Sequence, residues 1–346
     1  MPKALLPETT FTQRIEDKVN IRPHLSFLAK WTICGIALWW VARGVAVDEL
    51  LSSWLNANPL LLIGAIGIFL LTPVLQGVRL KRLLDAQGSP ISAAESIRLA
   101  FAGNFMNFAV PIGSTTGDVY KAAYLGRRSD RPWEVTVTTF IDRGIGLATL
   151  LLSVALIVLA SGPNSPLAPM KAYLALLSLG LIAGVGAIRW FPLQTLDHPR
   201  LAWVPARDKI VRVATAARGS VASPKILTLA ILDTLGIQIA ATASFLCVTL
   251  ALGFQMGSHD WFNLYAFFST GEIVKALPGP PQGLGTLEAA YGIFFQQWAT
   301  PSQIVNAAVA IRAINLICSL PGAALAIGSA RVFAPFDRPS TLVTGR

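Results

Sequence analysis

Long apolar runs separated by short polar and basic segments dominate the 346-residue sequence. A helix needs about 20 mostly apolar residues to cross a bilayer, and six runs meet or approach this length. They cover residues 26–47, 59–78, 132–160, 171–188, 226–252 and 301–330. The pattern therefore predicts an all-α polytopic membrane protein with six spanning helices.

A seventh apolar region, residues 261–298, is interrupted in its middle by a turn rich in proline and glycine. Proline removes a backbone donor and glycine permits conformations that a helix does not use, so no helix continues through this turn. The turn contains Pro278, Gly279, Pro281, Gly283 and Gly285. Each flank is shorter than a bilayer-spanning helix. We therefore expect a re-entrant helical hairpin, with Glu288 at the amino end of its outgoing half-helix, where the helix dipole favours an anion.

An eighth region, residues 91–126, has the same organisation. A short polar helix stops at a turn that contains Pro111, Gly113 and Gly117, and a second short helix follows Asp118. Basic residues on its flanks place both ends of this segment on one side of the membrane. The sequence predicts a second re-entrant hairpin, opposed to the first.

The distribution of basic residues predicts the orientation of the chain. Lys and Arg gather after residue 78, in the insert at residues 189–225 and near the carboxyl end, whereas residues 161–169 and 255–260 contain none. Basic loops stay on the cytoplasmic side, so both termini, including a polar lead at residues 1–25, are expected to be cytoplasmic. Residues 26–160 and 170–334 then each hold spans and one hairpin in opposite orientations, which is an inverted-topology repeat in an inner cell membrane.

Residue spacing supports this repeat independently of charge. In each half a proline precedes an acid by seven residues, and an arginine follows the acid after 24 or 25 residues. The residues are Pro111, Asp118 and Arg143 in the first half, and Pro281, Glu288 and Arg312 in the second. Both arginines lie 11 residues after a proline that can begin their helix, which is roughly 16 Å, near the middle of a ~30 Å hydrocarbon core.

Charges at this depth are costly and therefore candidate binding residues, although an internal ion pair that fixes helix packing is the alternative. We expect the two halves to pair crosswise, Asp118 with Arg312 and Glu288 with Arg143. A phosphate that displaces an acid would then allow the acid to take a proton. Asp142 adjoins Arg143 and points about 100° away from it, so it needs another partner.

Other polar residues near the two turns complete the candidate substrate-binding set. Lys121 follows Asp118 on the same short helix, and Glu272 and Lys275 share one face of the opposite hairpin and are expected to pair. Asn104 and Asn107 either satisfy the turn or contact a head group. The full set is Asn104, Asn107, Asp118, Lys121, Arg143, Glu272, Lys275, Glu288 and Arg312.

Composition excludes several other classes of function. The chain is 53% hydrophobic and 13% charged, so its net charge of +10 reflects cytoplasmic loops better than nucleic-acid binding. Its three cysteines and three histidines are scattered, which predicts no metal site and no disulfide framework. The sequence GSTTGD at residues 113–118 lacks the ending of a phosphate-binding P-loop, and no cofactor is expected.

The chain resembles the transmembrane region of lysylphosphatidylglycerol synthases and the flippase-like family that has this region alone. The resemblance rests on residues 104–118, Asp142-Arg143, residues 278–288 and Arg312. The resemblance covers about residues 26–330 and implies movement of lipids with charged head groups between leaflets. This chain has Gln282 where the family often has glycine, and aspartate at 118 and 142 where glutamate is common. The soluble aminoacyl-transferring domain is missing from the sequence, so no synthase activity is expected.

The leading hypothesis is thus a lipid flippase with a polar site at the midplane. A secondary transporter of a small anionic or ion-coupled solute is the alternative, and a lipid-modifying membrane enzyme comes third. The expected partners are membrane lipids with a charged or phosphate head group.

Overall fold

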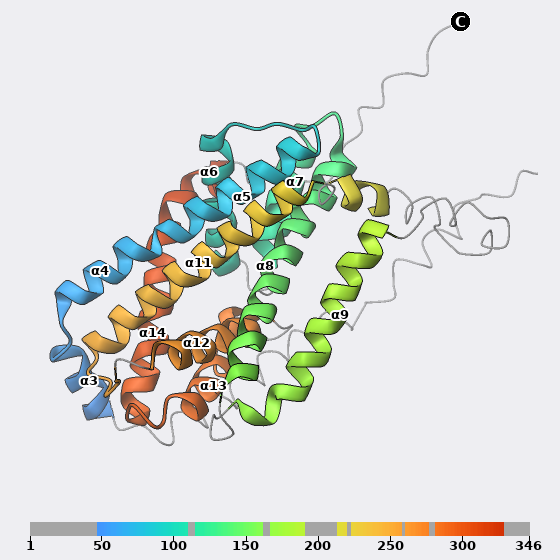
Figure 1. The fold of residues 1–346 in the computed structure, drawn as a ribbon. Helices are drawn as coiled ribbons and strands as arrows, with labels where there is room; N and C mark the ends of the chain where they lie inside the picture. The colour runs from blue at the N-terminus through green and yellow to red at the C-terminus, as the bar shows by residue number, and fades with distance from the viewer. Residues whose placement is uncertain are drawn as a thin grey trace, which may run out of the picture.

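The computed structural model describes residues 47–109, 115–161, 167–190, 213–219, 223–257, 260–276 and 281–328. All regular structure in these ranges is helical (Figure 1). The polar lead, nearly all of the first predicted span and most of the 189–225 insert lie outside the described residues. The all-α class predicted from the sequence is confirmed for the part that is described.

Four helices in the described ranges are long and apolar enough to cross a membrane, namely Pro59–Ala86, Pro132–Ala160, Pro224–Ala251 and Pro301–Gly328. Each begins with proline, whose fixed φ suits the first helical position and whose missing N–H would have no partner there. The first comprises α4 (Pro59–Phe69) and α5 (Leu71–Ala86), and the second and third are α8 and α11. The fourth comprises α14 (Pro301–Ser319), the 3₁₀ turn η6 (Leu320–Gly322) and α15 (Ala323–Gly328).

One difference from the predicted spans concerns helix length. The predicted span at residues 59–78 continues to Ala86, two turns further. The span predicted at residues 171–188 corresponds to α9 (Lys171–Trp190), which is 20 residues long. A short helix, α3 (Val47–Leu55), precedes the bundle.

Two helical hairpins lie at opposite ends of this bundle (Figure 1). The first joins α6 (Ala93–Ala109) to α7 (Thr116–Gly126), and the second joins α12 (Trp261–Ala276) to α13 (Thr286–Phe294) through the 3₁₀ turn η5 (Pro281–Gly283).

Contacts near the outer ends close each hairpin. Arg128 Nη1 lies 3.5 Å from Glu95 Oε1 beside the first hairpin, and the Gln255 N–H donates to the Trp298 carbonyl over 2.8 Å beside the second. Each hairpin thus begins and ends at one end of the bundle.

An aromatic cluster packs the second hairpin against α11. Phe245 stacks on Phe268 with ring centroids 4.8 Å apart, and Tyr291 meets Phe295 edge-on at 5.0 Å. These rings are fully or almost fully buried. Gly271 lets the hairpin close, because a Cβ there would lie 2.4 Å from the Tyr291 ring. The second hairpin is consequently an apolar, tightly packed element.

The carboxyl end of the bundle supports the first hairpin. At Gly322 a Cβ would lie 2.2 Å from the Phe101 carbonyl carbon, so the backbones of η6 and α6 are in direct contact. On the neighbouring helix, the Tyr120 hydroxyl donates to the Leu325 carbonyl over 3.3 Å. Helix α15 and the turn η6 thus hold the first hairpin in place.

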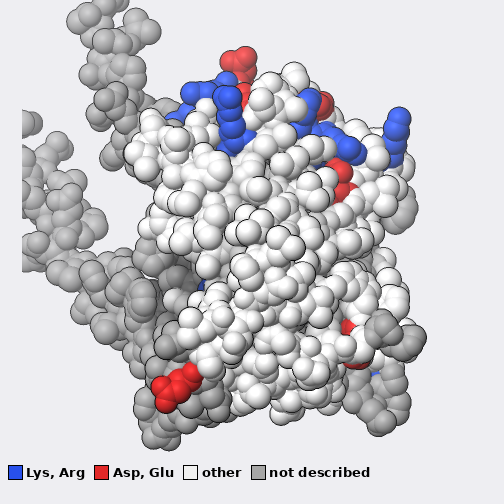
Figure 2. Space-filling model, turned by 90° about the vertical axis from the view of Figure 1, so that its left-hand side faces the viewer, with Lys and Arg blue, Asp and Glu red and all other residues white. Residues whose placement is uncertain are grey.

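The surface carries the charge pattern expected of a membrane protein. Figure 2 shows Lys and Arg gathered at one end of the face in view, above a wide band that is almost free of charge. Large apolar side chains such as Leu60, Leu156 and Leu176 are more than 65% exposed. Exposed apolar surface of this extent suits contact with lipid.

Candidate functional site

A polar cavity of about 270 Å³ lies between the first hairpin and helices α5, α8, α11 and α12. Its charged lining residues come from four different helices, α5, α7, α8 and α12, and include both signs. They are Arg79, Asp118, Lys121, Asp142, Arg143, Glu272 and Lys275. Asn104 and Asn107 also line the cavity. The seven charged residues are brought together from distant parts of the chain.

Asp118 is the centre of the charge cluster. It lies in the first turn of α7 and is 6% exposed. Lys121 Nζ approaches Asp118 Oδ1 at 2.7 Å, and Arg143 Nη1 donates to Asp118 Oδ2 over 2.8 Å. The Arg143 side chain remains 23% exposed. One carboxylate is therefore shared by two cations, which leaves an excess of positive charge at this point.

The turn of the first hairpin places Asp118 by a close approach of two backbones. A Cβ on Gly117 would lie 2.1 Å from the Gly103 carbonyl oxygen, so only glycine fits between α6 and α7. The Gly117 N–H donates to Asn107 Oδ1 over 2.7 Å, which satisfies a free donor at the start of α7. Asn107 thus serves the turn, while Asn104 faces the cavity. Pro111 and Gly113 lie outside the described residues.

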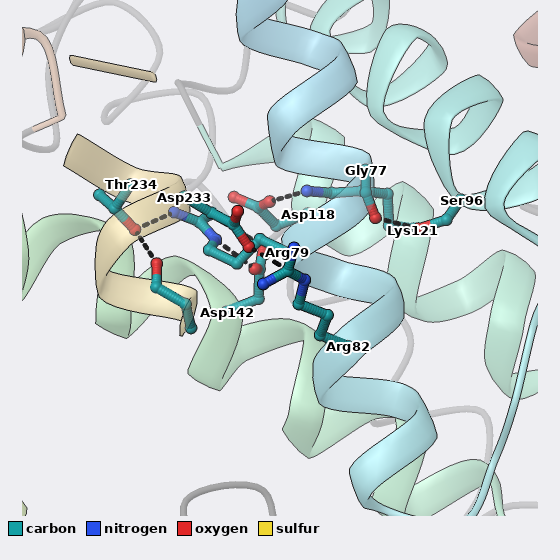
Figure 3. A network of polar contacts seen from close by, with 10 residues as sticks. Gly77, Arg79, Arg82, Ser96, Asp118, Lys121, Asp142, Asp233 and Thr234 are labelled. Carbon is teal, nitrogen blue, oxygen red and sulfur yellow. Dashed lines mark hydrogen bonds and ion pairs between the residues drawn. The ribbon is translucent and has the colours of Figure 1, made fainter. Parts of the chain in front are cut away.

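Asp142 finds its partner in Arg79, which the sequence had placed among the basic residues that follow a span (Figure 3). Arg79 Nε and Nη2 donate to the two carboxylate oxygens over 2.6 and 3.1 Å, and Arg79 Nη1 donates to Thr234 Oγ1 over 2.8 Å. Both charged side chains are at most 7% exposed. The predicted span ended at residue 78, but α5 continues beyond Arg79 and buries it.

A second ion pair extends this network toward the end of α5. Arg82 Nε lies 3.5 Å from Asp233 Oδ2, and Asp233 precedes Thr234 on α11 (Figure 3). Asp233, isolated in the sequence, thus acquires a counter-ion. Helices α5, α8 and α11 are joined by these charges.

The crosswise pairing of the two halves is wrong. Asp118 pairs with Arg143, and Glu288 pairs with Arg312, so each acid contacts the arginine of its own half. The proton route that relied on cross-pairing is withdrawn with it. In the second half, Arg312 Nη2 donates to Glu288 Oε2 over 2.9 Å, and Arg312 Nη1 contacts the other carboxylate oxygen.

Glu288 and Arg312 organise the turn of the second hairpin. Glu288 Oε2 accepts from the Gly285 N–H over 2.8 Å, and Arg312 Nη2 donates to the Gly283 carbonyl over 3.1 Å. Gly283 and Gly285 have φ values of 63° and 80°, which glycine adopts without steric cost. Neither Glu288 nor Arg312 is among the described residues that line the cavity. Pro278 and Gly279 lie outside the described residues, and Pro281 begins η5.

Gln282 connects the two hairpins. Its φ is 52° and its ψ is 22°, in the left-handed region that favours glycine. The side chain compensates, since its Nε2 donates to the Asn107 carbonyl over 3.1 Å. The tips of the two hairpins therefore touch beside the cavity, which Gln282 also lines.

The remaining predicted pair is present on α12. Lys275 Nζ lies 2.6 Å from Glu272 Oε2, as the three-residue spacing indicated, and both side chains line the cavity.

The sequence analysis missed Gln238, a neutral residue in an apolar segment. Gln238 Oε1 accepts hydrogen bonds from the hydroxyls of Tyr265 and Ser153, whereas its buried Nε2 has no hydrogen-bond partner among the described residues. Gln238 lines the cavity and is 7% exposed.

No curated protein sequence matches the chain. The family model described as the lysylphosphatidylglycerol synthase TM region matches residues 27–322, which include both hairpins, the four long helices to the end of η6 and every charged residue of the cavity. The chain therefore belongs to the family of the lysylphosphatidylglycerol synthase transmembrane region.

Proposed function

We propose that this protein is a lipid flippase that moves lipids with a charged, phosphate-containing head group between leaflets. The observation that carries the proposal is the carboxylate of Asp118, which is shared by Lys121 and Arg143 inside a polar cavity. Membership of a membrane family related to lipid handling supports the same function.

The geometry at Asp118 suits a competition between two anions. A lipid phosphodiester presents two anionic oxygens, as a carboxylate does, and arginine presents a planar fork of donors that matches either group. Hydrogen bonds to charged groups contribute about 1.5–3 kcal/mol each. A lipid phosphate can therefore replace part of the Asp118 contacts at modest net cost, so that binding is favourable but reversible.

The depth of the site fits passage between leaflets. Arg143 lies 11 residues into α8, roughly 16 Å from its start, which is near the centre of a ~30 Å hydrocarbon core. In this proposal the head group crosses through the cavity while the acyl chains stay in the bilayer. A polar path at this depth removes the cost of carrying a charge through hydrocarbon.

The proposed topology is an inverted repeat with two re-entrant hairpins and cytoplasmic termini in an inner membrane. It is supported by the opposite placement of the hairpins and by the gathering of basic side chains at one end of the molecule (Figures 1 and 2). Non-helical turns at membrane depth are tolerated where they are buried in protein or line a cavity, and Gln282 lines the cavity.

Reconstitution in vesicles tests this function. Lipids that carry a fluorophore on an acyl chain are bleached from outside by a membrane-impermeant reductant, so lipid movement makes the inner-leaflet pool accessible. We expect wild-type protein to move a phosphate-bearing lipid and Arg143→Gln to abolish this movement while the protein stays folded. Arg98→Gln is the matched control, because Arg98 is an exposed arginine outside the cavity.

Two results would contradict the proposal. One is equal lipid movement by the Arg143→Gln variant and the wild type. The other is uptake of a water-soluble glycerophosphate with no lipid movement, which would instead support the solute transporter.

A further inference from the structure

The charges of the cavity do not balance. Among the described lining residues there are four cations, Arg79, Lys121, Arg143 and Lys275, and three carboxylates, Asp118, Asp142 and Glu272. Asp142 and Glu272 each pair with a cation within the lining, and Asp118 pairs with two. The excess charge is therefore one positive charge, and it is located beside Asp118.

This balance discriminates between lipid head groups. A head group with an amine requires a carboxylate to accept it, and every carboxylate of the described lining already contacts a cation. Binding the amine would separate one of these pairs inside a largely buried site, which is costly. An anionic phosphodiester instead neutralises the single positive excess.

Gln238 supplies a second point of recognition, on the α11 side of the cavity. Its Nε2 bears two N–H donors that have no partner among the described residues, although the amide oxygen is fixed by Tyr265 and Ser153. Gln238 lies one helical turn, roughly 6 Å, beyond Thr234, which contacts Arg79. A buried donor without a partner is unfavourable, so a ligand that brings an acceptor oxygen to this position is favoured.

Building on the proposed flippase function, we propose that the cavity selects a lipid with net negative charge whose head group extends beyond the phosphate with a hydroxyl, as in phosphatidylglycerol. Lys121 and Arg143 bind the phosphate, and Gln238 Nε2 donates to an oxygen of the head group. Gln238 is thereby a specificity-determining residue, and zwitterionic or cationic lipids are poorer substrates.

The test uses the full chain in vesicles with four lipids that share the same labelled acyl chains. They are phosphatidylglycerol, phosphatidic acid, phosphatidylethanolamine and lysylphosphatidylglycerol. We expect phosphatidylglycerol to move at least about tenfold faster than the two amine-bearing lipids, given one charged hydrogen bond of difference. Fastest movement of lysylphosphatidylglycerol, or equal rates for all four lipids, would refute the selectivity while leaving lipid movement itself established. Movement of none of them would instead refute the proposed flippase function.

Variants of Gln238 test its role separately. Gln238→Leu removes the donors and should slow phosphatidylglycerol about fivefold, the value of one neutral hydrogen bond, while phosphatidic acid, which lacks the extended head group, moves as before. Gln238→Glu is nearly isosteric and adds a fourth carboxylate to the lining, so it should shift preference toward phosphatidylethanolamine.

Thr242→Val is the matched control, because Thr242 lies one turn further on α11, is fully buried and does not line the cavity. It should leave lipid preference unchanged. Unchanged preference in both Gln238 variants, or an equal loss for phosphatidylglycerol and phosphatidic acid in Gln238→Leu, would remove Gln238 from recognition.

Discussion

Replacing Gly117 by alanine should separate the two helices of the first hairpin. The added Cβ would lie 2.1 Å from the Gly103 carbonyl oxygen, whereas such contacts essentially never fall below 3.0 Å. The two backbones must therefore move apart by about 1 Å, the difference between these values. Overpacking of this kind costs about 1–3 kcal/mol, and loss of the Asn107–Gly117 hydrogen bond adds about 1 kcal/mol.

The same displacement moves Asp118 and Lys121, which follow Gly117 on α7. The 2.8 Å contact of Asp118 with Arg143 on α8 would lengthen toward or beyond the ~3.2 Å limit of a good hydrogen bond, whereas the contact between Asp118 and Lys121 lies within α7 and moves with it. We therefore expect lipid movement per folded molecule to fall about tenfold, in addition to a lower free energy of unfolding. Vesicle reconstitution with quantified folded protein measures the first effect, and equilibrium unfolding in mixed micelles measures the second.

Gly144→Ala provides the control for this substitution. Gly144 is also a helical glycine, adjacent to Arg143, but a Cβ there meets nothing within 4 Å. Alanine should stabilise α8 by up to about 1 kcal/mol and leave lipid movement intact. If Gly117→Ala behaves like Gly144→Ala in both assays, the contact between α6 and α7 does not position the site.

Three further predictions concern topology and the second turn. In a cysteine-free background, Asn56→Cys should react with an impermeant thiol reagent on intact cells and Asp130→Cys only after permeabilisation; the opposite pattern would reverse the proposed orientation. Arg312→Gln should lower the free energy of unfolding by about 3–5 kcal/mol, because it leaves Glu288 buried without its counter-ion. Adding Glu288→Gln to the same chain should restore part of this loss, and additive losses of unfolding free energy in mixed micelles would contradict the pairing. Gln282→Gly should change the free energy of unfolding by less than about 1 kcal/mol, since relief of the left-handed backbone offsets the lost hydrogen bond to Asn107. If thermal unfolding shows that this free energy falls by more than about 2 kcal/mol, the hydrogen bond dominates.

The interruptions of the apolar pattern predicted much of the helical architecture. Proline at the first position of α4, α8 and α14 and the positive φ of Gly283 and Gly285 follow directly from the steric properties of these residue types. The spacing between acid and arginine was also informative, although the crosswise pairing expected for these residues was wrong. From Asp118, α7 runs outward for eight residues and α8 returns for 11 residues to Arg143, so the two lie at similar depth in neighbouring antiparallel helices.

Other parts of the site depend on contacts that a single sequence does not contain. The predicted span ended just before Arg79 because basic residues usually follow a span, but α5 continues for seven residues beyond it. The signal for this buried position was that Asp142 needed a partner for its charge, which Arg79 provides. Gln238 gave no such signal in the sequence, because its role depends on contacts with Ser153 and Tyr265, which are 85 and 27 residues away.

The contact between η6 and α6 can form only after nearly the whole chain has been synthesised, long after the first hairpin has been made. Phe101 and Gly322 are separated by about 220 residues, and their backbones touch in the finished structure. At about 5–20 residues per second, a ribosome needs roughly 10–40 s to make the intervening chain. For that time the first hairpin, with its buried Asp118 and Lys121, has been made but lacks the helix that holds it. Its polar residues must meanwhile remain shielded from hydrocarbon, by the insertion machinery or by delayed entry into the bilayer.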